Sequence, residues 1–130
     1  MTNLVTVDDE SLVTDFLAFL LESEGYCVYP ATNGKEAREV IARVRPALVI
    51  TDLMMPVQSG LELATVLRAS VEFKHLPIIL CSAVPGAIAQ ADRHLFSAML
   101  QKPYPPAELV QLVASYVRHA GPAEAEDGSM

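Results

Sequence analysis

The chain has 130 residues, of which 52% are hydrophobic and 19% are charged, and this composition is typical of one compact globular domain. Sixteen acidic residues against nine basic ones give a formal net charge of -7, so we do not expect nucleic acid as a direct partner. No apolar run approaches the roughly 18 residues that a membrane helix needs, and the first residues lack a secretion signal, which predicts a cytoplasmic protein without a membrane partner. Cys27 and Cys81 lie in apolar runs outside any CxxC pair, so we expect reduced core residues.

The first half of the chain alternates between strand and helix patterns. Apolar runs typical of strands are each followed by apolar residues at helical spacing. In the first helix these residues are Leu12, Phe16, Phe19 and Leu20. Asn33 is suited to cap the second helix, and the Ser59–Glu62 capping box is suited to open the third. We therefore expect a strand followed by a helix three times, with the strands at residues 4–7, 26–29 and 47–51.

The second half of the chain continues this alternation with two more strands. We expect strands at residues 77–82 and 98–101, a weakly amphipathic helix at 87–95 and a final helix from Pro106. The last residues, 121–130, are acidic and small, and they predict a disordered tail because they cannot bury a core. Residues 1–120 are therefore expected to form one domain.

Five successive strand–helix units predict an α/β fold, a doubly wound parallel five-stranded sheet covered by helices on both faces. In such sheets the functional residues usually lie at the carboxyl ends of the strands. Four of the five expected strands deliver polar or charged residues to that edge: Asp8 and Asp9, Asp52, Ser82 and Lys102. The topology alone makes these residues neighbours.

Three carboxylates gathered at one edge need compensation of their charge. Two carboxylates about 4 Å apart repel by about 4 kcal/mol at an effective dielectric near 20, and the single charge of Lys102 is too little to neutralise three. A hard divalent cation such as Mg²⁺ takes oxygen ligands and retains waters, so its charge would directly offset the repulsion between the carboxylates. Its open positions would suit a phosphoryl group, with a carboxylate as nucleophile and Lys102 and Ser82 stabilising the phosphoryl oxygens.

At this point the sequence resembles the receiver domains of two-component response regulators, including the chemotaxis regulator. The resemblance covers roughly residues 3–119 and implies a flavodoxin-like (βα)5 fold with strand order 2-1-3-4-5. It rests on an ordered set of segments: Val7–Glu10, Asp52–Pro56 leading to Gly60–Leu63, Ser82–Ala83 and Lys102–Tyr104.

The same resemblance implies a role for each residue of the set. Asp52 would accept a phosphoryl group from the phosphohistidine of a histidine kinase or a phosphotransfer protein, and Ser82 and Lys102 would contact the aspartyl phosphate. Mg²⁺ would be bound by Asp9, Asp52 and the Met54 carbonyl, and Asp8 would reach the ion through water. The chain would then be a signalling domain that catalyses its own phosphotransfer, and not an enzyme acting on a separate substrate.

Two sites depart from the family pattern: Leu95–Phe96 stands where receivers usually carry a small Gly-Ala pair, and Met99 is the second. Met99 stands where receivers usually carry the aromatic residue that reports phosphorylation, so readout through a rotating ring is in doubt. Met54 and Val84 stand at the two positions that vary most with dephosphorylation control, and neither side chain can hydrogen-bond an attacking water. We therefore expect a slowly hydrolysed phosphoaspartate. Because only a short tail follows Ala120, a stand-alone receiver that signals to a downstream protein target by contact is expected.

Other functions remain open at this point. The changes at Met99 and at Leu95–Phe96 allow a degenerate receiver that binds partners without phosphate. An aspartate-nucleophile phosphatase shares the chemistry, but it carries an Asp-x-Asp pattern that Asp8–Glu10 does not match. A flavin binder shares the fold, but it needs a Ser/Thr/Gly-rich loop after the first strand. Asp8 and Asp9 could also be no more than a helix N-cap pair.

Overall fold

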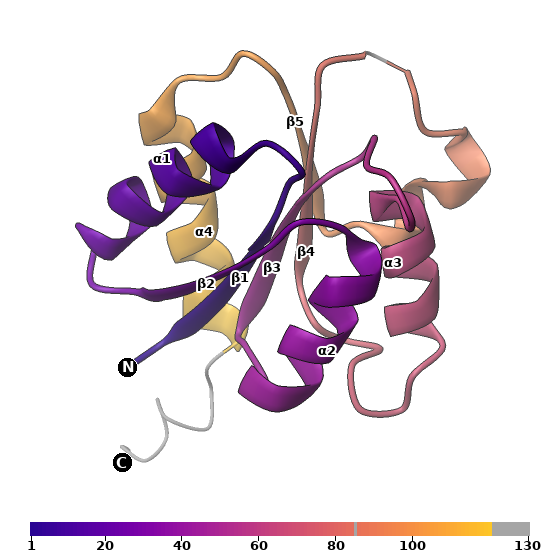
Figure 1. Cartoon of the computed structure of the whole chain (residues 1–130), viewed down its shortest axis with the longest axis horizontal. Coiled ribbons are helices and arrows are strands. Elements are labelled where there is room, and N and C mark those ends of the chain that lie inside the picture. Colours follow the sequence, from indigo (N-terminus) through magenta and orange to yellow (C-terminus); the bar gives the residue numbers. More distant parts are fainter. Residues whose placement is uncertain (85, 121–130) are drawn as a thin grey trace.

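The structure is a computed structural model that describes residues 1–84 and 86–120 (Figure 1). Five parallel strands form one sheet in the order β2-β1-β3-β4-β5, which confirms the expected topology. The strands are β1 (Asn3–Val7), β2 (Cys27–Ala31), β3 (Leu48–Asp52), β4 (Ile78–Ser82) and β5 (Ala98–Gln101). The expected acidic tail lies outside the described residues.

Helices cover both faces of the sheet and enclose two apolar clusters. The helical elements are α1 (Ser11–Glu22), α2 (Gly34–Val44), α3 (Gly60–Arg68), the 3-10 helix η1 (Gln90–Leu95) and α4 (Pro106–Ala120). In Figure 1, α1 and α4 lie on one side of the sheet, and α2, α3 and η1 lie on the other. Leu17, Leu109 and Val113 pack on the first face, whereas Ile41, Leu63 and Leu67 pack on the second. Among the described residues, none of the helices combines the length and the hydropathy needed to span a bilayer.

The predicted caps of α2 and α3 are confirmed. The side chain of Asn33 accepts a hydrogen bond of 2.9 Å from the Glu36 N–H. Ser59 and Glu62 form the reciprocal capping box, because each side chain accepts a hydrogen bond from the backbone N–H of the other residue. These local bonds satisfy donors that the first turn of a helix leaves free, and they fix where each helix begins.

The helix predicted at residues 87–95 is confirmed only in part. The chain there forms only the six-residue η1, in which no residue is buried. Long helices in proteins are stabilised by packing of an apolar face, and this stretch supplies only Ile88 as a fully buried apolar residue, just before η1. Gly86 adopts a left-handed backbone conformation with φ of 72° at the start of the stretch, which favours a turn over a helical entry.

The helix α1 is confirmed, but three of the four residues that predicted it are exposed, and only Leu20 packs partly against the core. Leu12 is 82% exposed and Phe19 is 76% exposed, whereas Thr14, Leu17 and Leu21 form the buried face. Because α1 is apolar around most of its circumference, periodicity could not choose the side that packs on the sheet.

Both cysteines are free thiols, as expected. Cys81 is buried, and burial raises the pKa of its thiol to about 11, so the thiol stays protonated at neutral pH. Cys27 is only half-buried, so its assignment to the core is wrong. Cys27 lies on β2, an edge strand of the sheet.

Candidate functional site

The two acidic residues after β1 occupy different environments. Asp8 is buried, with 3% exposure, and its backbone N–H donates to the Ala31 carbonyl at 3.1 Å. Its side chain accepts a hydrogen bond of 2.9 Å from the Glu10 N–H. Asp9 is exposed at the rim. The N-cap of α1 is Glu10, whose side chain makes no capping bond, so neither aspartate acts as the N-cap residue of α1.

The backbone of Asp52 at the end of β3 is held by a glycine of the next helix. Gly60 donates its N–H to the Leu53 carbonyl at 2.9 Å. A Cβ atom added at Gly60 would lie 2.2 Å from the Asp52 carbonyl oxygen, far inside van der Waals contact. Only glycine permits this approach, so the first residue of α3 fixes the position of the Asp52 backbone.

The three carboxylates meet at one edge, as the topology predicted. Carboxylate oxygens of Asp8, Asp9 and Asp52 all lie within 4.8 Å of one another. The Lys102 ammonium at the end of β5 donates to Asp8 Oδ2 and to Asp52 Oδ1, each at 3.3 Å. The Lys102–Pro103 peptide bond is cis. One cation thus contacts two of the three carboxylates, and the cluster retains an excess of negative charge.

The electrostatics of the cluster favour an added cation. Burial raises the pKa of the Asp52 carboxyl, with a further contribution from the charge of Asp8, and the ion pair with Lys102 offsets this only in part. Burial opposes the charge of Lys102, but the carboxylates of Asp52 and Asp8 together outweigh it and raise the pKa of Lys102. The hard oxygen donors of the three aspartates match the ligands that Mg²⁺ takes, so the residues present fit a magnesium ion.

Ser82 and Met54 lie near this edge, but neither makes a hydrogen bond to the carboxylates of Asp8, Asp9 or Asp52. Ser82 ends β4, where its neighbour Cys81 is the register partner of Asp52. The Ser82 hydroxyl oxygen accepts a hydrogen bond of 3.2 Å from the Val84 N–H. Met54 is in the loop after β3, with its side chain 72% exposed. Their predicted roles at the phosphoryl group and the metal stay predictions.

Two glycines, Gly34 and Gly60, whose close backbone contacts were not predicted from the sequence, hold the loop beside Asp52. Gly34 donates its N–H to the Gln58 carbonyl at 2.9 Å, and a Cβ at Gly34 would lie 2.9 Å from that oxygen. With Gly60, it anchors the β3–α3 loop, in which Val57 adopts a φ of 69° that β-branched residues rarely tolerate. The sequence does contain a sign of these close contacts, because each glycine directly follows an N-cap residue, at a position where a stronger helix former is otherwise expected.

The family model of the response regulator receiver domain matches residues 4–114. The chain belongs to the response regulator receiver domain family. The phosphate regulon transcriptional regulatory protein PhoB of Pseudomonas aeruginosa is 32% identical over 95% of this chain, and the chain spans 55% of the length of that protein. The match to the family model confirms the expected family. The members of this family are signalling domains.

Solved structures of receiver domains agree with the fold. The response regulator TrrA of Thermotoga maritima, solved in complex with Mg²⁺ and BeF, is 31% identical with a TM-score of 0.82, and the match covers 89% of this chain and 99% of that one. The chemotaxis response regulator CheY4 of Vibrio cholerae has a TM-score of 0.81 at 24% identity, with 89% of this chain and 98% of that chain covered. The likeness to CheY4 supports the flavodoxin-like fold of this receiver domain.

Proposed function

We propose that this receiver domain accepts a phosphoryl group on Asp52 from the phosphohistidine of a histidine kinase or a phosphotransfer protein, in a reaction that depends on Mg²⁺. It acts in the cytoplasm in two-component signalling and passes the signal to a downstream protein by contact. The observation that carries the proposal is the cluster in which the Asp52 carboxylate lies within 4.8 Å of two others and 3.3 Å from the Lys102 ammonium.

The transfer step uses the Asp52 carboxylate as nucleophile. One of its oxygens forms a bond to phosphorus, and the P–N bond of the phosphohistidine breaks. The leaving nitrogen keeps the electron pair and regains a proton. Lys102 is within reach of the Asp52 carboxylate and would hold a phosphoryl oxygen, while the Ser82 hydroxyl would donate to another once the group has moved.

The metal is assigned to the acidic edge of the sheet. Asp9, Asp52 and the Met54 carbonyl would hold Mg²⁺, and Asp8 would reach it through water. When bound, Mg²⁺ supplies positive charge that offsets the carboxylates and the phosphoryl oxygens. Asp8 keeps Lys102 oriented by the second hydrogen bond that this lysine makes.

The phosphorylated state is expected to be long-lived. Water must be oriented to attack the aspartyl phosphate, and polar side chains beside the site usually do this by hydrogen bonding. Met54 and Val84, 72% and 56% exposed at the rim, offer no such group. Hydrolysis would then depend on a group supplied by another protein.

A degenerate receiver that binds partners without phosphate is the second candidate. It is favoured by the region around Met99, where a methionine replaces the switch aromatic and the 3-10 helix η1 replaces a full helix. An aspartate-nucleophile phosphatase fits less well, because Asp8 at the end of β1 is buried and already accepts bonds from Glu10 and Lys102. A flavin site would need a loop without the acidic run after β1.

The test is incubation of the full chain with acetyl phosphate, with and without Mg²⁺, followed by mapping of the phosphoryl adduct by mass spectrometry. We expect an adduct on Asp52 only when Mg²⁺ is present. Asp52→Asn should give none, whereas the matched control Asp15→Asn, an exposed aspartate of α1, should behave like the unaltered chain.

Other outcomes separate the candidates. A folded protein that forms no adduct supports the degenerate receiver. Continuous release of phosphate that survives Asp52→Asn supports the phosphatase, with its nucleophile at Asp8 or Asp9.

A further inference from the structure

The segment that joins β2 to α2 contacts both of the loops that carry candidate metal ligands. Ala31, at the end of β2, accepts a hydrogen bond of 3.1 Å from the N–H of Asp8, in the loop between β1 and α1. Gly34, the first residue of α2, donates its N–H to the Gln58 carbonyl at 2.9 Å, in the loop between β3 and α3. We call residues 31–34 the bridge, because they join these two loops.

The bridge is held in one shape by hydrogen bonds of its own. The Asn33 side chain accepts from the Glu36 N–H at 2.9 Å. The Glu36 carboxylate accepts in turn from the N–H of Thr32 at 2.6 Å and from its hydroxyl at 2.8 Å. These two bonds from Thr32 lower the pKa of Glu36, so the carboxylate stays charged and continues to accept them at neutral pH. A displacement at one end of the bridge is therefore passed to the other end.

Gly34 packs against Gln58 without space for a side chain. A Cβ atom at Gly34 would lie 2.9 Å from the carbonyl oxygen and from Cγ of Gln58, and 3.0 Å from its Cβ. All three distances are shorter than van der Waals contact. The buried Oε1 atom of Gln58 has no hydrogen-bond partner among the described residues, so the position of this side chain depends on packing, including the packing against Gly34.

The loop to which Gln58 belongs is strained. The Gln58 N–H donates to the Pro56 carbonyl at 2.7 Å and closes a three-residue turn around Val57, whose φ is 69°. A positive φ at the centre of such a turn is rare, and a β-branched residue tolerates it poorly. Strained backbone of this kind persists only where the surrounding contacts hold it.

Two glycine contacts hold this strained loop near its ends. Gly60 donates its N–H to the Leu53 carbonyl, and Gly34 donates its N–H to the Gln58 carbonyl, each at 2.9 Å. Met54 lies between Leu53 and Gln58 in the chain. A shift at either contact would therefore displace the Met54 carbonyl.

Magnesium is sensitive to small displacements of its ligands. Mg²⁺ requires near-ideal octahedral geometry at about 2.0–2.1 Å, whereas Ca²⁺ accepts flexible geometry at about 2.3–2.6 Å. A side chain at Gly34 would force Gln58 or the bridge to move. Such a shift between the two loops should weaken the binding of Mg²⁺ more than the binding of Ca²⁺.

We propose that the bridge holds the β1–α1 loop and the β3–α3 loop at the spacing that Mg²⁺ requires, and that Gly34 is the positioning residue. Gly34 does not contact the ion, because it acts through Gln58 and the loop that carries Met54. The inference rests on the metal assignment of the proposed function. It adds to that assignment a determinant of metal selectivity outside the set of ligands.

The experiment is isothermal titration calorimetry of the full, unphosphorylated chain with Mg²⁺ and, separately, with Ca²⁺. We expect Gly34→Ala to weaken Mg²⁺ binding by about tenfold, as is typical when a residue that orients metal ligands is changed. The same variant should weaken Ca²⁺ binding by a smaller factor. A purely structural role for Gly34 would change the affinities for both ions by the same factor or leave both unchanged.

A matched glycine variant controls for strain elsewhere in the fold. Gly25, in the turn before β2, has a φ of 96°, and a Cβ atom there would meet no atom within 4 Å. Gly25→Ala therefore strains the backbone outside the bridge and should leave both affinities unchanged. If Gly34→Ala does not fold, as judged by circular dichroism, Glu36→Ala loosens the bridge from within and should also weaken Mg²⁺ binding more than Ca²⁺ binding.

Three results would overturn the role of the bridge. The first is an unchanged Mg²⁺ affinity in Gly34→Ala, or in Glu36→Ala where that variant replaces it. The second is an equal loss of affinity for Mg²⁺ and Ca²⁺. The third is the same loss of Mg²⁺ affinity in Gly25→Ala.

Asp9→Ala separates this inference from the metal assignment on which it rests. If the unaltered chain binds Mg²⁺, Asp9→Ala abolishes binding and Gly34→Ala has no effect, the role of the bridge is wrong and the metal assignment stands. If the unaltered chain binds no Mg²⁺, the metal assignment and the role of the bridge are both wrong.

Discussion

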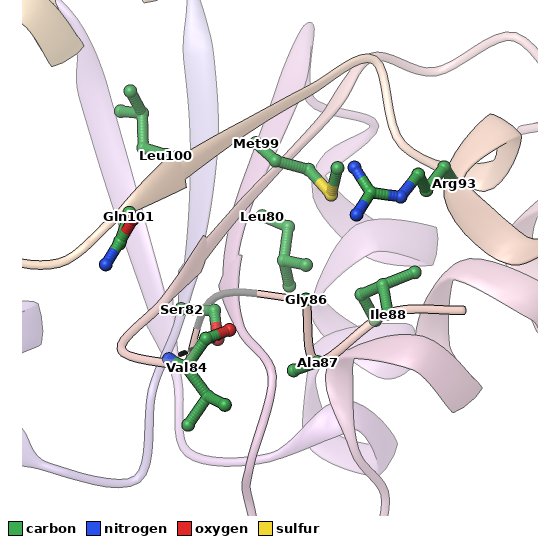
Figure 2. A pocket seen from close by; sticks show the side chains of 10 residues that line it. All are labelled: Leu80, Ser82, Val84, Gly86, Ala87, Ile88, Arg93, Met99, Leu100 and Gln101. Carbon is green, nitrogen blue, oxygen red and sulfur yellow. Dashed lines mark hydrogen bonds between the residues drawn. The ribbon is translucent and has the colours of Figure 1, made fainter. Parts of the chain in front are cut away.

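The carboxyl edge of the sheet has two halves that are built differently. At the ends of β1 and β3, the aspartates are held by backbone contacts: Asp8 bonds to the Ala31 carbonyl and the Glu10 N–H, and Gly60 lies against the Asp52 carbonyl. At the ends of β4 and β5, the Ser82 carbonyl accepts a hydrogen bond from the Lys102 N–H, but the Ser82 side chain bonds only locally to Val84, and an open pocket beside Ser82 replaces packed helix (Figure 2). The first half leaves little freedom for change. In the second half only Lys102 contacts the aspartates, and the loop after Ser82 can vary without disturbing the cluster.

The largest effect is expected from Gly60→Ala in the first half. The added Cβ would meet the Asp52 carbonyl oxygen at 2.2 Å, so backbone must shift, and we expect the free energy of unfolding to fall by about 3 kcal/mol. Gly86→Ala is the comparison in the second half, where φ is 72° but a Cβ would meet no atom within 4 Å; it should cost about 1 kcal/mol. Urea unfolding of both variants measures the difference. Equal losses would contradict the contrast between the two halves.

Magnesium should stabilise the first half directly. If Mg²⁺ binds the folded chain at the three aspartates, a concentration of 100 times its Kd raises the free energy of unfolding by about 2.7 kcal/mol. Thermal unfolding with Mg²⁺ and with EDTA measures this gain. Asp9→Ala should abolish it and Asp15→Asn should retain it. A gain that survives Asp9→Ala would place the ion elsewhere.

The rate of dephosphorylation should depend on the side chains of Met54, in the loop after β3, and Val84, in the loop after β4. In the double variant Met54→Asn with Val84→Glu, polar groups can orient the attacking water. One hydrogen bond of about 1 kcal/mol would speed hydrolysis of the aspartyl phosphate by about fivefold. The decay of the phosphorylated protein after removal of acetyl phosphate gives the rate. An unchanged lifetime would show that these two positions do not limit hydrolysis in this chain.

The smallest effect concerns the pH dependence of stability without divalent cations. Burial raises the pKa of Asp52 in the folded state, so its charged form destabilises the fold at neutral pH, and this cost disappears as the pH falls through the raised pKa. Asp52→Asn should therefore be more stable than the unaltered chain at pH 7 in EDTA. The difference in the free energy of unfolding between Asp52→Asn and the unaltered chain should vanish below a pH of about 3.9, which is the pKa of an aspartate in an unfolded chain. Urea unfolding across this pH range checks the sign, and a lower stability of Asp52→Asn at pH 7 would reverse it.

Local sequence signals predicted where helices occur more reliably than which face of a helix is buried. The caps at Asn33 and Ser59 marked the starts of α2 and α3 because their bonds involve only neighbouring residues. The spacing of Leu12 and Phe19 predicted α1 but not its orientation, since both residues face outward. The close contacts of Gly34 and Gly60, the first residues of α2 and α3, were not predicted. The Gln58 and Asp52 carbonyls that they touch belong to other segments of the chain.

By itself, the sequence determined the succession of strands and helices, and with it the gathering of Asp8, Asp9, Asp52 and Lys102 at one edge, because parallel strands must end on the same side of a sheet. Only the tertiary structure decided which face of α1 is buried and that residues 87–95 form no α-helix. Both depend on how much apolar surface one segment can bury against another, and a periodic pattern within a single segment does not contain that information.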